Sequence, residues 1–230
     1  MWILNKKLLY LLLLISCTIQ AQDILFVGNS LTYYNNMPKI LELLAEENGV
    51  QIQTTSLCFP NYAIIDHLDS GKLQHLLKKQ SFDYVIVQQG PSSQAQGKQM
   101  LFADGAKVKA LCKQYKAQLG YYMVWPSLQY YYTFDKVIKN HTLAAQKNKA
   151  LLFPVGVVWK KYNTYKSKTL LYDSDNFHPS KAGSFLAALT IFHTLYPKKN
   201  LYQLPYENYS NWVNDKDSFQ LIVKLVSEPK

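Results

Sequence analysis

The sequence predicts an α/β fold of three layers, in which a doubly wound parallel sheet of five strands lies between two layers of helices. Two observations lead to this prediction. Short apolar runs that suit buried strands alternate along the chain with longer segments whose apolar residues recur at helical spacing. The expected strands are apolar almost throughout, which is typical of parallel strands covered on both faces.

In the first half of the chain, sequence patterns typical of strands alternate with patterns typical of helices. Residues 23–28 are a short apolar run that ends at a glycine, and residues 37–47 carry apolar residues at helical spacing. Residues 51–57 alternate as a second strand, and residues 64–79 place several leucines on one side of a helix. Residues 83–87 are nearly all apolar, so we expect a third buried strand there.

The second half repeats the alternation. We expect a long helix over 98–117 and a fourth strand over 119–125, since the first segment has helical periodicity and the second is continuously apolar. A helix over 133–148 then precedes a fifth strand over 150–155, and a strongly apolar helix over 180–195 follows. Such a flavodoxin-like sheet binds ligands outside the carboxyl ends of its strands.

The ends of the chain set the domain limits. Residues 1–21 have a basic start, a short apolar run and a small polar end, which is the layout of a secretory signal peptide. We therefore expect an exported protein, periplasmic or extracellular, with no stable membrane insertion after the signal is removed. A lipid anchor on Cys17 is the less favoured alternative. Residues 22–230 are expected to form one domain, on which a C-terminal extension over 200–230 packs with a helix around 215–226.

Charge and cysteines exclude several classes of protein. The net charge is +10 and every fixed positive side chain is a lysine, but the lysines are scattered, so we expect a solvated basic surface and no nucleic-acid partner. Beyond Cys17, the chain has Cys58 and Cys112, which we interpret as buried thiols, with a disulfide between them as the alternative. No cluster of cysteine and histidine indicates a metal site.

Two motifs carry chemistry. Ser30 follows Gly28 in the turn after the first strand, where a serine is exposed at the top of the sheet, although a helix cap or a phosphate loop has the same appearance. Asp175 stands three residues before His178, and both precede the strongly apolar helix expected over residues 180–195. A histidine can take the proton of a hydroxyl nucleophile, and a carboxylate can hold that histidine in the right tautomer.

Together the motifs resemble those of the SGNH/GDSL hydrolases. Residues 28–31 (Gly-Asn-Ser-Leu) are similar to the first block of the family, with Asn29 where aspartate is commoner, and residues 175–178 (Asp-Asn-Phe-His) are similar to its last block. The stretch from Phe153 to Ala187 resembles a secreted Bacteroidetes-type subgroup. The resemblance implies an SGNH hydrolase fold and a catalytic triad of Ser30, His178 and Asp175.

The remaining blocks of the family supply the oxyanion hole, and there the chain departs from the pattern. After the second strand, Pro60 has no N–H, so the backbone N–H of Asn61 is the candidate donor, beside that of Ser30. After the third strand, the side chain of Gln89 is the leading candidate, with Gln88 and Ser92 as alternatives. This turn resembles the Gln-Gly-Glu-Ser-Asn turn of certain carbohydrate acetylesterases.

The resemblance implies a serine esterase that needs no metal or cofactor. Its expected substrate is a small-molecule or carbohydrate ester with a short acyl group, above all acetyl. Two other hypotheses stay open: a non-catalytic carbohydrate-binding protein on the same fold, and a phosphate-holding loop for a nucleotide or flavin, which leaves Asp175 and His178 unexplained. Further candidates for substrate contacts are Asn29, Gln88, Ser92, Trp125 and Tyr130. The two aromatic rings suit stacking on a sugar, or packing against neighbouring loops.

Overall fold

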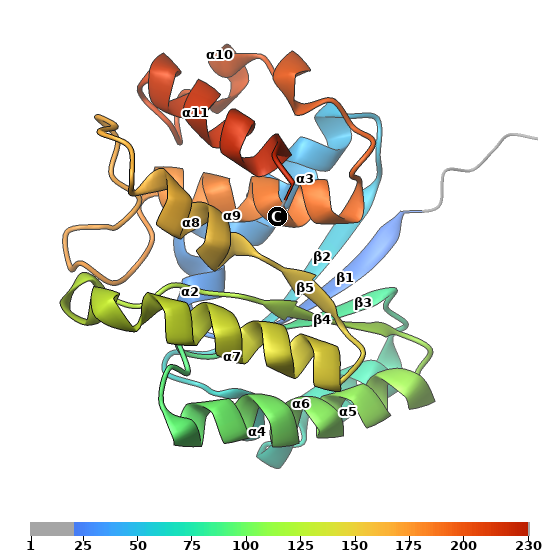
Figure 1. Ribbon diagram of the computed structural model, residues 1–230. Coiled ribbons are helices and arrows are strands. Elements are labelled where there is room, and N and C mark those ends of the chain that lie inside the picture. The colour runs from blue at the N-terminus through green and yellow to red at the C-terminus, as the bar shows by residue number, and fades with distance from the viewer. Residues whose placement is uncertain (1–20, 230) are drawn as a thin grey trace, which may run out of the picture.

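The computed structural model describes residues 21–229 of the chain and shows one sheet of five strands (Figure 1). All neighbouring strands are parallel and their order is β2-β1-β3-β4-β5. The strands are β1 (Gln22–Gly28), β2 (Ile52–Cys58), β3 (Tyr84–Val87), β4 (Gln118–Tyr122) and β5 (Leu151–Phe153). The predicted doubly wound parallel sheet of five strands is confirmed.

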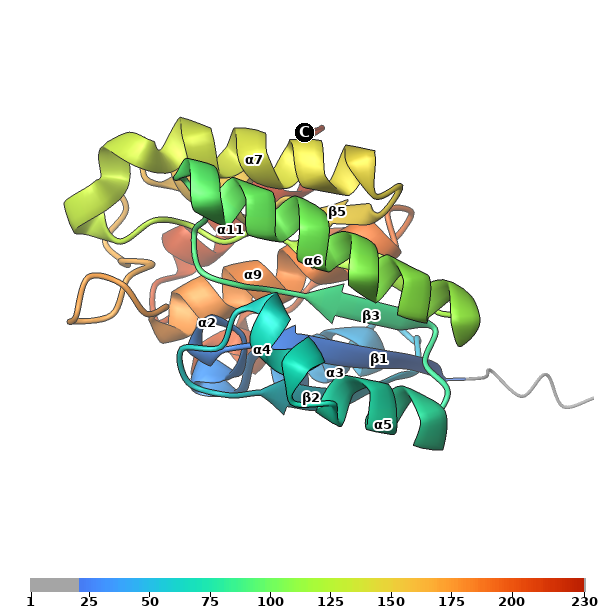
Figure 2. The same ribbon diagram turned by 90° about the horizontal axis from the view of Figure 1, so that it is seen from below.

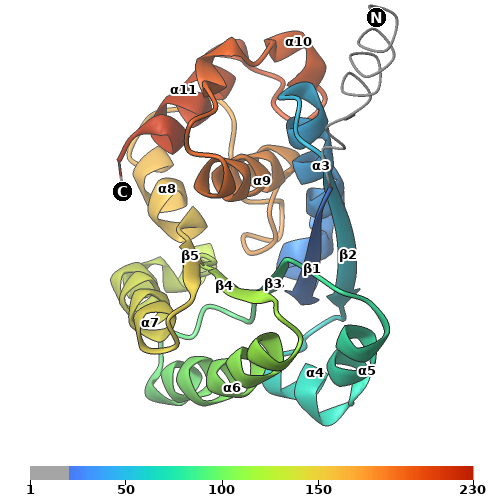
Figure 3. The same ribbon diagram turned by 90° about the vertical axis from the view of Figure 1, so that its right-hand side faces the viewer.

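Helices cover both faces of the sheet, which makes three layers (Figure 3). One face is covered by α3 (Met37–Glu47), α8 (Val155–Tyr162), α9 (Lys181–Leu195) and α11 (Lys216–Ser227). The other face is covered by α4 (Ile64–Asp69), α5 (Lys72–Lys79), α6 (Ala95–Gln114) and α7 (Phe134–Lys147), as Figure 2 shows from below. Short elements lie between these helices: α2 (Ser30–Tyr33), η1 (Tyr34–Asn36), η2 (Leu128–Thr133), η3 (Leu201–Gln203) and α10 (Tyr206–Tyr209).

The core has two parts, one on each face of the sheet. In β1, Ile24 and Phe26 belong to the part beneath α3 and α9, whereas Leu25 and Val27 belong to the part beneath α4, α5 and α6. Successive side chains of a strand point to opposite faces, so a continuously apolar strand serves both parts. Because β1 lies between β2 and β3, its carboxyl end, and with it Ser30, is flanked by the loops that follow both of these strands.

The C-terminal extension lies over α9. Residues 182–192 of α9 are buried without interruption, because α9 lies on the sheet between α3 and α8 and α11 lies over it. Phe219 of α11 packs against Phe185 of α9 and Tyr209 of α10. This packing explains why the sequence of α9 is apolar on all sides.

Three segments differ from the sequence-based expectation. The helix expected over 64–79 is broken in two by Gly71, whose φ of 68° lies in the left-handed region. The strand expected over 119–125 ends at Tyr122, and residues 123–125 continue as a buried loop. The strand expected over 150–155 ends at Phe153, and α8, which the periodicity did not predict, starts at Val155. Both strands end together because Tyr122 and Phe153 are the last pair of their ladder.

Cys58 and Cys112 are free thiols, and burial raises the pKa of each to about 12. The predicted signal peptide, apart from its last residue, and Cys17 lie outside the described residues. Among residues 21–229, no helix combines the length and apolar character needed to cross a membrane.

Candidate active site

Ser30 is the first residue of α2, directly after β1 and the turn residue Asn29. The side chain of Asn29 caps this helix, since its Oδ1 accepts the N–H of Leu31 at 3.1 Å. Its Nδ2 donates to the carbonyl of Tyr62 at 2.9 Å, which ties the loop after β2 to the turn. Both ends of the Asn29 amide are therefore engaged in holding the turn, and the contact of Asn29 with substrate stays a prediction.

The peptide group between Gly28 and Asn29 is held from two sides. Its carbonyl accepts a hydrogen bond from Nε2 of the buried His67 at 2.9 Å, and its N–H donates to Oε1 of the buried Gln88 at 3.0 Å. The hydroxyl of Thr32 donates to the same Oε1 at 2.9 Å. A Cβ on Gly28 would lie 2.6 Å from this oxygen, so glycine is required where Gln88 approaches the backbone. We call this arrangement of His67 and Gln88 the peptide clamp.

His67 is neutral in this environment. Desolvation lowers its pKa, and the carbonyl of Gly28 can only accept, so Nε2 carries the ring hydrogen. The structure puts His67 beneath the turn that carries Ser30, packed near Phe59 and Tyr62.

Ser30, His178 and Asp175 form a hydrogen-bonded series. Nε2 of His178 lies 2.9 Å from Oγ of Ser30, although the two residues are 148 positions apart in the chain. Nδ1 of His178 lies 2.5 Å from Oδ2 of Asp175. The other carboxylate oxygen of Asp175 accepts the backbone N–H groups of Phe177 and His178, each at 2.9 Å. Such a series allows an imidazole to take the proton of a serine hydroxyl while a carboxylate orients it.

The carboxylate of Asp175 stays ionised. Its hydrogen bond with His178, helped by the two N–H groups it accepts, holds the pKa of Asp175 below its usual range, although partial desolvation opposes this. An ionised carboxylate keeps the hydrogen of the imidazole on Nδ1. This leaves the lone pair of Nε2 directed at the hydroxyl of Ser30.

Several contacts hold the loop that carries Asp175 and His178. The N–H of Asp173 donates to the carbonyl of His178 at 2.8 Å and closes the loop on itself. The N–H of Leu128 in η2 donates to the carbonyl of Asn176 at 2.9 Å. The ring of Tyr34, in η1, stacks on the imidazole of His178 with centroids 4.6 Å apart. Tyr34 was not singled out from the sequence, because its position beside His178 depends on how η1 meets this loop.

Trp125 holds the loop from within and is not a substrate contact. It is 0% exposed, and its ring stacks on that of Trp159 at 3.6 Å. Its indole N–H donates to the carbonyl of Phe177 at 3.0 Å, next to His178. The predicted stacking of Trp125 on a sugar is therefore wrong, because the chain after β4 turns inward before it reaches the surface.

Candidate oxyanion donors lie in two neighbouring turns. Within residues 21–229, neither the N–H of Ser30 nor that of Asn61 donates a hydrogen bond. Asn61 has a φ of 63°, and its loop is held against the turn of Ser30 by the contact between Asn29 and Tyr62. Both N–H groups are thus available to a developing negative charge.

Of the three side chains considered for completing the oxyanion hole, those of Gln89 and Ser92 are engaged elsewhere. Nε2 of Gln89 donates to Oγ of Ser92 at 2.8 Å and to the carbonyl of Gly97 at 3.4 Å. The hydroxyl of Ser92 in turn donates to the carbonyl of Gly90 at 2.8 Å. Nε2 of Gln88 is buried and has no partner within the described chain, while its Oε1 belongs to the peptide clamp. Gln88 therefore holds the turn of Ser30 through its Oε1. Gln89 and Ser92 stabilise the loop after β3 through their hydrogen bonds within that loop.

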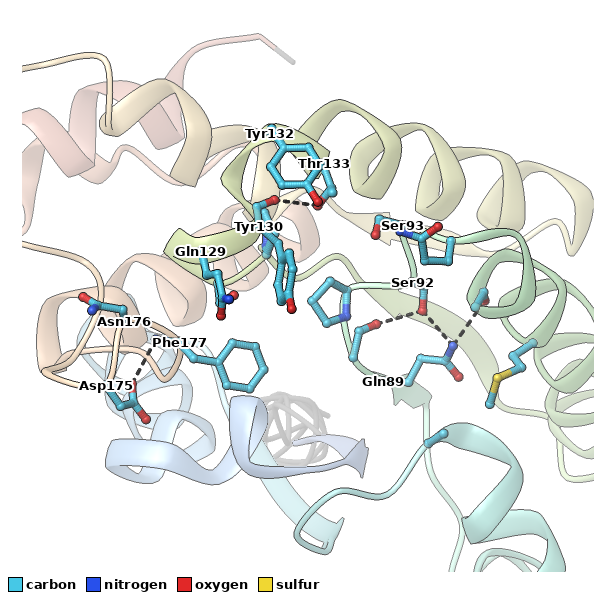
Figure 4. A pocket seen from close by; sticks show the side chains of 18 residues that line it. Gln89, Ser92, Ser93, Gln129, Tyr130, Tyr132, Thr133, Asp175, Asn176 and Phe177 are labelled. Carbon is cyan, nitrogen blue, oxygen red and sulfur yellow. Dashed lines mark hydrogen bonds between the residues drawn. The ribbon is translucent and has the colours of Figure 1, made fainter.

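A pocket of about 1090 Å³ adjoins the hydrogen-bonded series of Ser30, His178 and Asp175. It is lined by residues of the loops after β3 and β4 and of the loop before α9. Figure 4 shows Tyr130 and Phe177 directed into it from one side, with Gln89 and Ser92 on the other. Tyr130 is 51% exposed, as its predicted substrate contact requires. Among the described residues, Asp175 is the one charged residue in its lining, so the pocket disfavours an anionic ligand. Within residues 21–229, no three side chains of His, Cys, Asp or Glu gather as a metal site.

No family model matches the chain, and no curated protein matches it in sequence. Solved structures do match it. A protein from Slackia heliotrinireducens, described as a candidate SGNH hydrolase, has 26% identity and a TM-score of 0.65 over 76% of this chain and 100% of its own. A DUF4886 family protein from Bacteroides uniformis has 15% identity and a TM-score of 0.74 over 90% of this chain and 94% of its own. An acetyl xylan esterase, AlAXEase, has 12% identity and a TM-score of 0.59 over 75% of this chain and 99% of its own.

These likenesses agree with the expected resemblance at the level of the fold, while the secreted Bacteroidetes-type subgroup stays a prediction. The chain has an α/β fold with a five-stranded, all-parallel sheet of order β2-β1-β3-β4-β5, which is the fold of the SGNH hydrolases that it resembles in structure.

Proposed function

We propose that this protein is a serine esterase that acts through an acyl-enzyme. The observation that carries the proposal is the distance of 2.9 Å between Nε2 of His178 and Oγ of Ser30, with Nδ1 of the same ring held by Asp175. A serine hydroxyl is a weak nucleophile until a base takes its proton, and this geometry provides the base and its orienting partner.

In the proposed reaction, Oγ of Ser30 attacks the ester carbonyl as His178 takes its proton. The N–H groups of Ser30 and Asn61 stabilise the oxyanion of the tetrahedral intermediate. The intermediate collapses, and His178 gives its proton to the departing alcohol. Water then attacks the acyl-enzyme with His178 again as base, which releases the acid and restores Ser30.

We propose a short acyl group, above all acetyl, carried on a carbohydrate. The pocket that Asp175 lines also has the exposed ring of Tyr130 and a polar wall, and rings of this kind can stack on a sugar while their polar tips hydrogen-bond. The likeness to an acetyl xylan esterase points the same way. The signal peptide expected over residues 1–21 suits an enzyme that meets such esters outside the cytoplasm.

Hydrolysis of p-nitrophenyl acetate by the chain from residue 22 onward, with Ser30→Ala and His178→Ala beside it, tests the reaction. We expect turnover by the parent and a loss of at least about a thousandfold in kcat for each variant. Tyr202→Ala, a change at an exposed tyrosine of η3, is the control and should leave kcat unchanged.

Two results would contradict the proposal. Turnover that persists in Ser30→Ala would remove this serine as nucleophile. A folded parent that neither hydrolyses aryl acetates and acetylated sugars nor gains a covalent adduct on Ser30 from a reactive phosphonate would favour the non-catalytic carbohydrate-binding protein on the same fold.

A further inference from the structure

A second pocket, of about 540 Å³, lies on the other side of the loop that carries His178. Asn176 lines both pockets. The hydrogen bond from the N–H of Leu128 to the carbonyl of Asn176 joins η2 to this loop, so the two residues form a ridge between the pockets. The reaction described above uses only the first pocket and leaves the second without a role.

Exposed apolar side chains gather around these two pockets. Leu128 and Tyr130 belong to η2, while Tyr165 and Leu170, which are 42% and 73% exposed, belong to the loop after α8. Each of the four lines one of the two pockets. A soluble protein that exposes such residues together, and not scattered over its surface, commonly uses them to bind something.

The lining of the second pocket combines aromatic rings, leucine side chains and polar groups. Tyr131, Tyr162, Tyr165 and Tyr172 contribute rings. Within the described chain, the side chains of Asn163, Tyr165, Ser174 and Asn176 make no hydrogen bond, so their polar groups are available to a ligand. An acyl chain would leave these groups without partners, whereas a sugar offers hydroxyl groups to pair with them.

The charges of the residues that line the two pockets restrict the class of ligand further. The chain carries 25 lysines, yet among the described residues no lysine lines either pocket. The charged residues of the two linings in this part of the chain are Asp175 and Asp173. Carboxylates disfavour a nearby anion, so uronic acid polymers and phosphorylated headgroups are disfavoured. A neutral sugar meets no such penalty.

We propose that the second pocket is a binding subsite for a neutral oligosaccharide, and that the substrate is a polysaccharide chain crossing the ridge at Leu128 and Asn176. The acetylated sugar lies in the first pocket, beside Ser30, and sugars further along the chain lie in the second pocket, against Tyr165. This inference rests on the proposed esterase activity for its kinetic test, but not for its binding test.

The kinetic test uses acetylated xylo-oligosaccharides of one to six sugars. We expect kcat/KM of the parent to rise with length, and Tyr165→Ala to lower it by about tenfold for the longest substrate, the value of one aromatic contact. Hydrolysis of p-nitrophenyl acetate and of the monosaccharide ester should be unchanged in Tyr165→Ala. The matched control is Tyr202→Ala, because Tyr202 is 66% exposed and lines neither of the two pockets.

The binding test uses the Ser30→Ala protein in affinity electrophoresis through deacetylated xylan and glucomannan. Retardation that Tyr165→Ala weakens and Tyr202→Ala does not would support the subsite, even if the parent hydrolyses no ester. Aryl acetate hydrolysis with neither retardation nor a length effect would overturn the subsite and leave the esterase standing. A kcat/KM that rises with acyl chain length, and loses that rise in Tyr165→Ala, would make the pocket an acyl site and overturn the proposal.

Discussion

At the scale of single residues, the position of Ser30 depends on a peptide group that precedes it. The peptide clamp takes the carbonyl of Gly28 with His67 and the N–H of Asn29 with Gln88. The N–H of Ser30 belongs to the next peptide group, so holding the Gly28–Asn29 peptide in place limits where the N–H and the hydroxyl of Ser30 can point. Reaction rates are sensitive to shifts of about 1 Å in a reacting group, so these buried side chains position the nucleophile.

Replacing His67 tests this role. His67→Phe keeps the ring but removes the donor to Gly28, so we expect kcat for p-nitrophenyl acetate to fall by about 10–100-fold with little change in KM. His141→Phe is the matched control, because His141 is equally buried but bonds only to Val137 of its own helix. Equal losses in the two variants, or a kcat unchanged in His67→Phe while thermal melting shows a folded protein, would argue against the clamp.

At the scale of elements, the break at Gly71 divides the segment after β2 into two helices with different tasks. The shorter helix, α4, carries His67 to the turn of Ser30, and α5 covers the sheet with Leu73 and Leu77. One straight helix could not do both, since the two segments take different directions from Gly71 (Figure 2). The left-handed φ of 68° at this residue allows the change of direction.

Gly71→Ala should therefore cost about 1 kcal/mol of the free energy of unfolding, from backbone strain alone. Steric contact plays no part, because a Cβ at this position would meet no atom within 4 Å. Gly90→Ala is the matched control for stability: its added Cβ would likewise have open space, and its φ is not positive. Urea unfolding measures both, and equal stabilities of the two variants would show that Gly71 is not strained by a side chain.

At the scale of the whole molecule, the C-terminal extension completes the core on one face of the sheet. Phe219 is buried between α9 and α10 and belongs to the same apolar cluster as Phe26 of β1. The extension therefore shares its buried surface with the sheet that carries the site. We expect residues 22–230 to unfold as one cooperative unit, as the sequence predicts for a single domain.

Phe219→Ala should lower the free energy of unfolding by about 3 kcal/mol, because it removes a buried ring and leaves a cavity. Chemical denaturation followed by both tryptophan fluorescence and circular dichroism should give one coincident transition for parent and variant. The exposed change Tyr202→Ala should shift stability by less than about 0.5 kcal/mol. Separate transitions for the extension and the sheet would contradict the single unit.

The sequence by itself determined the order of the strands and of most of the helices between them, and it supplied Ser30, Asp175 and His178 as candidate residues. Apolar runs and helical periodicity are local properties, so they predicted five parallel strands and placed the loops at their carboxyl ends. Ser30 after the first strand, and Asp175 three residues before His178, could be chosen as candidates because such chemistry needs those residue types at such places. The parallel sheet places Ser30 at its carboxyl edge, and the loop between α8 and α9 brings Asp175 and His178 to the same place.

Only the tertiary structure decided which side chains surround that series. Trp125 turned out buried, Tyr34 stacks on His178, and His67 lies beneath the turn of Ser30. Gln89, chosen for its residue type, gives its amide hydrogens to Ser92 and Gly97. The physical reason is that hydrogen-bond partners and burial depend on how distant loops pack together, and a residue's neighbours in sequence carry almost no information about that packing.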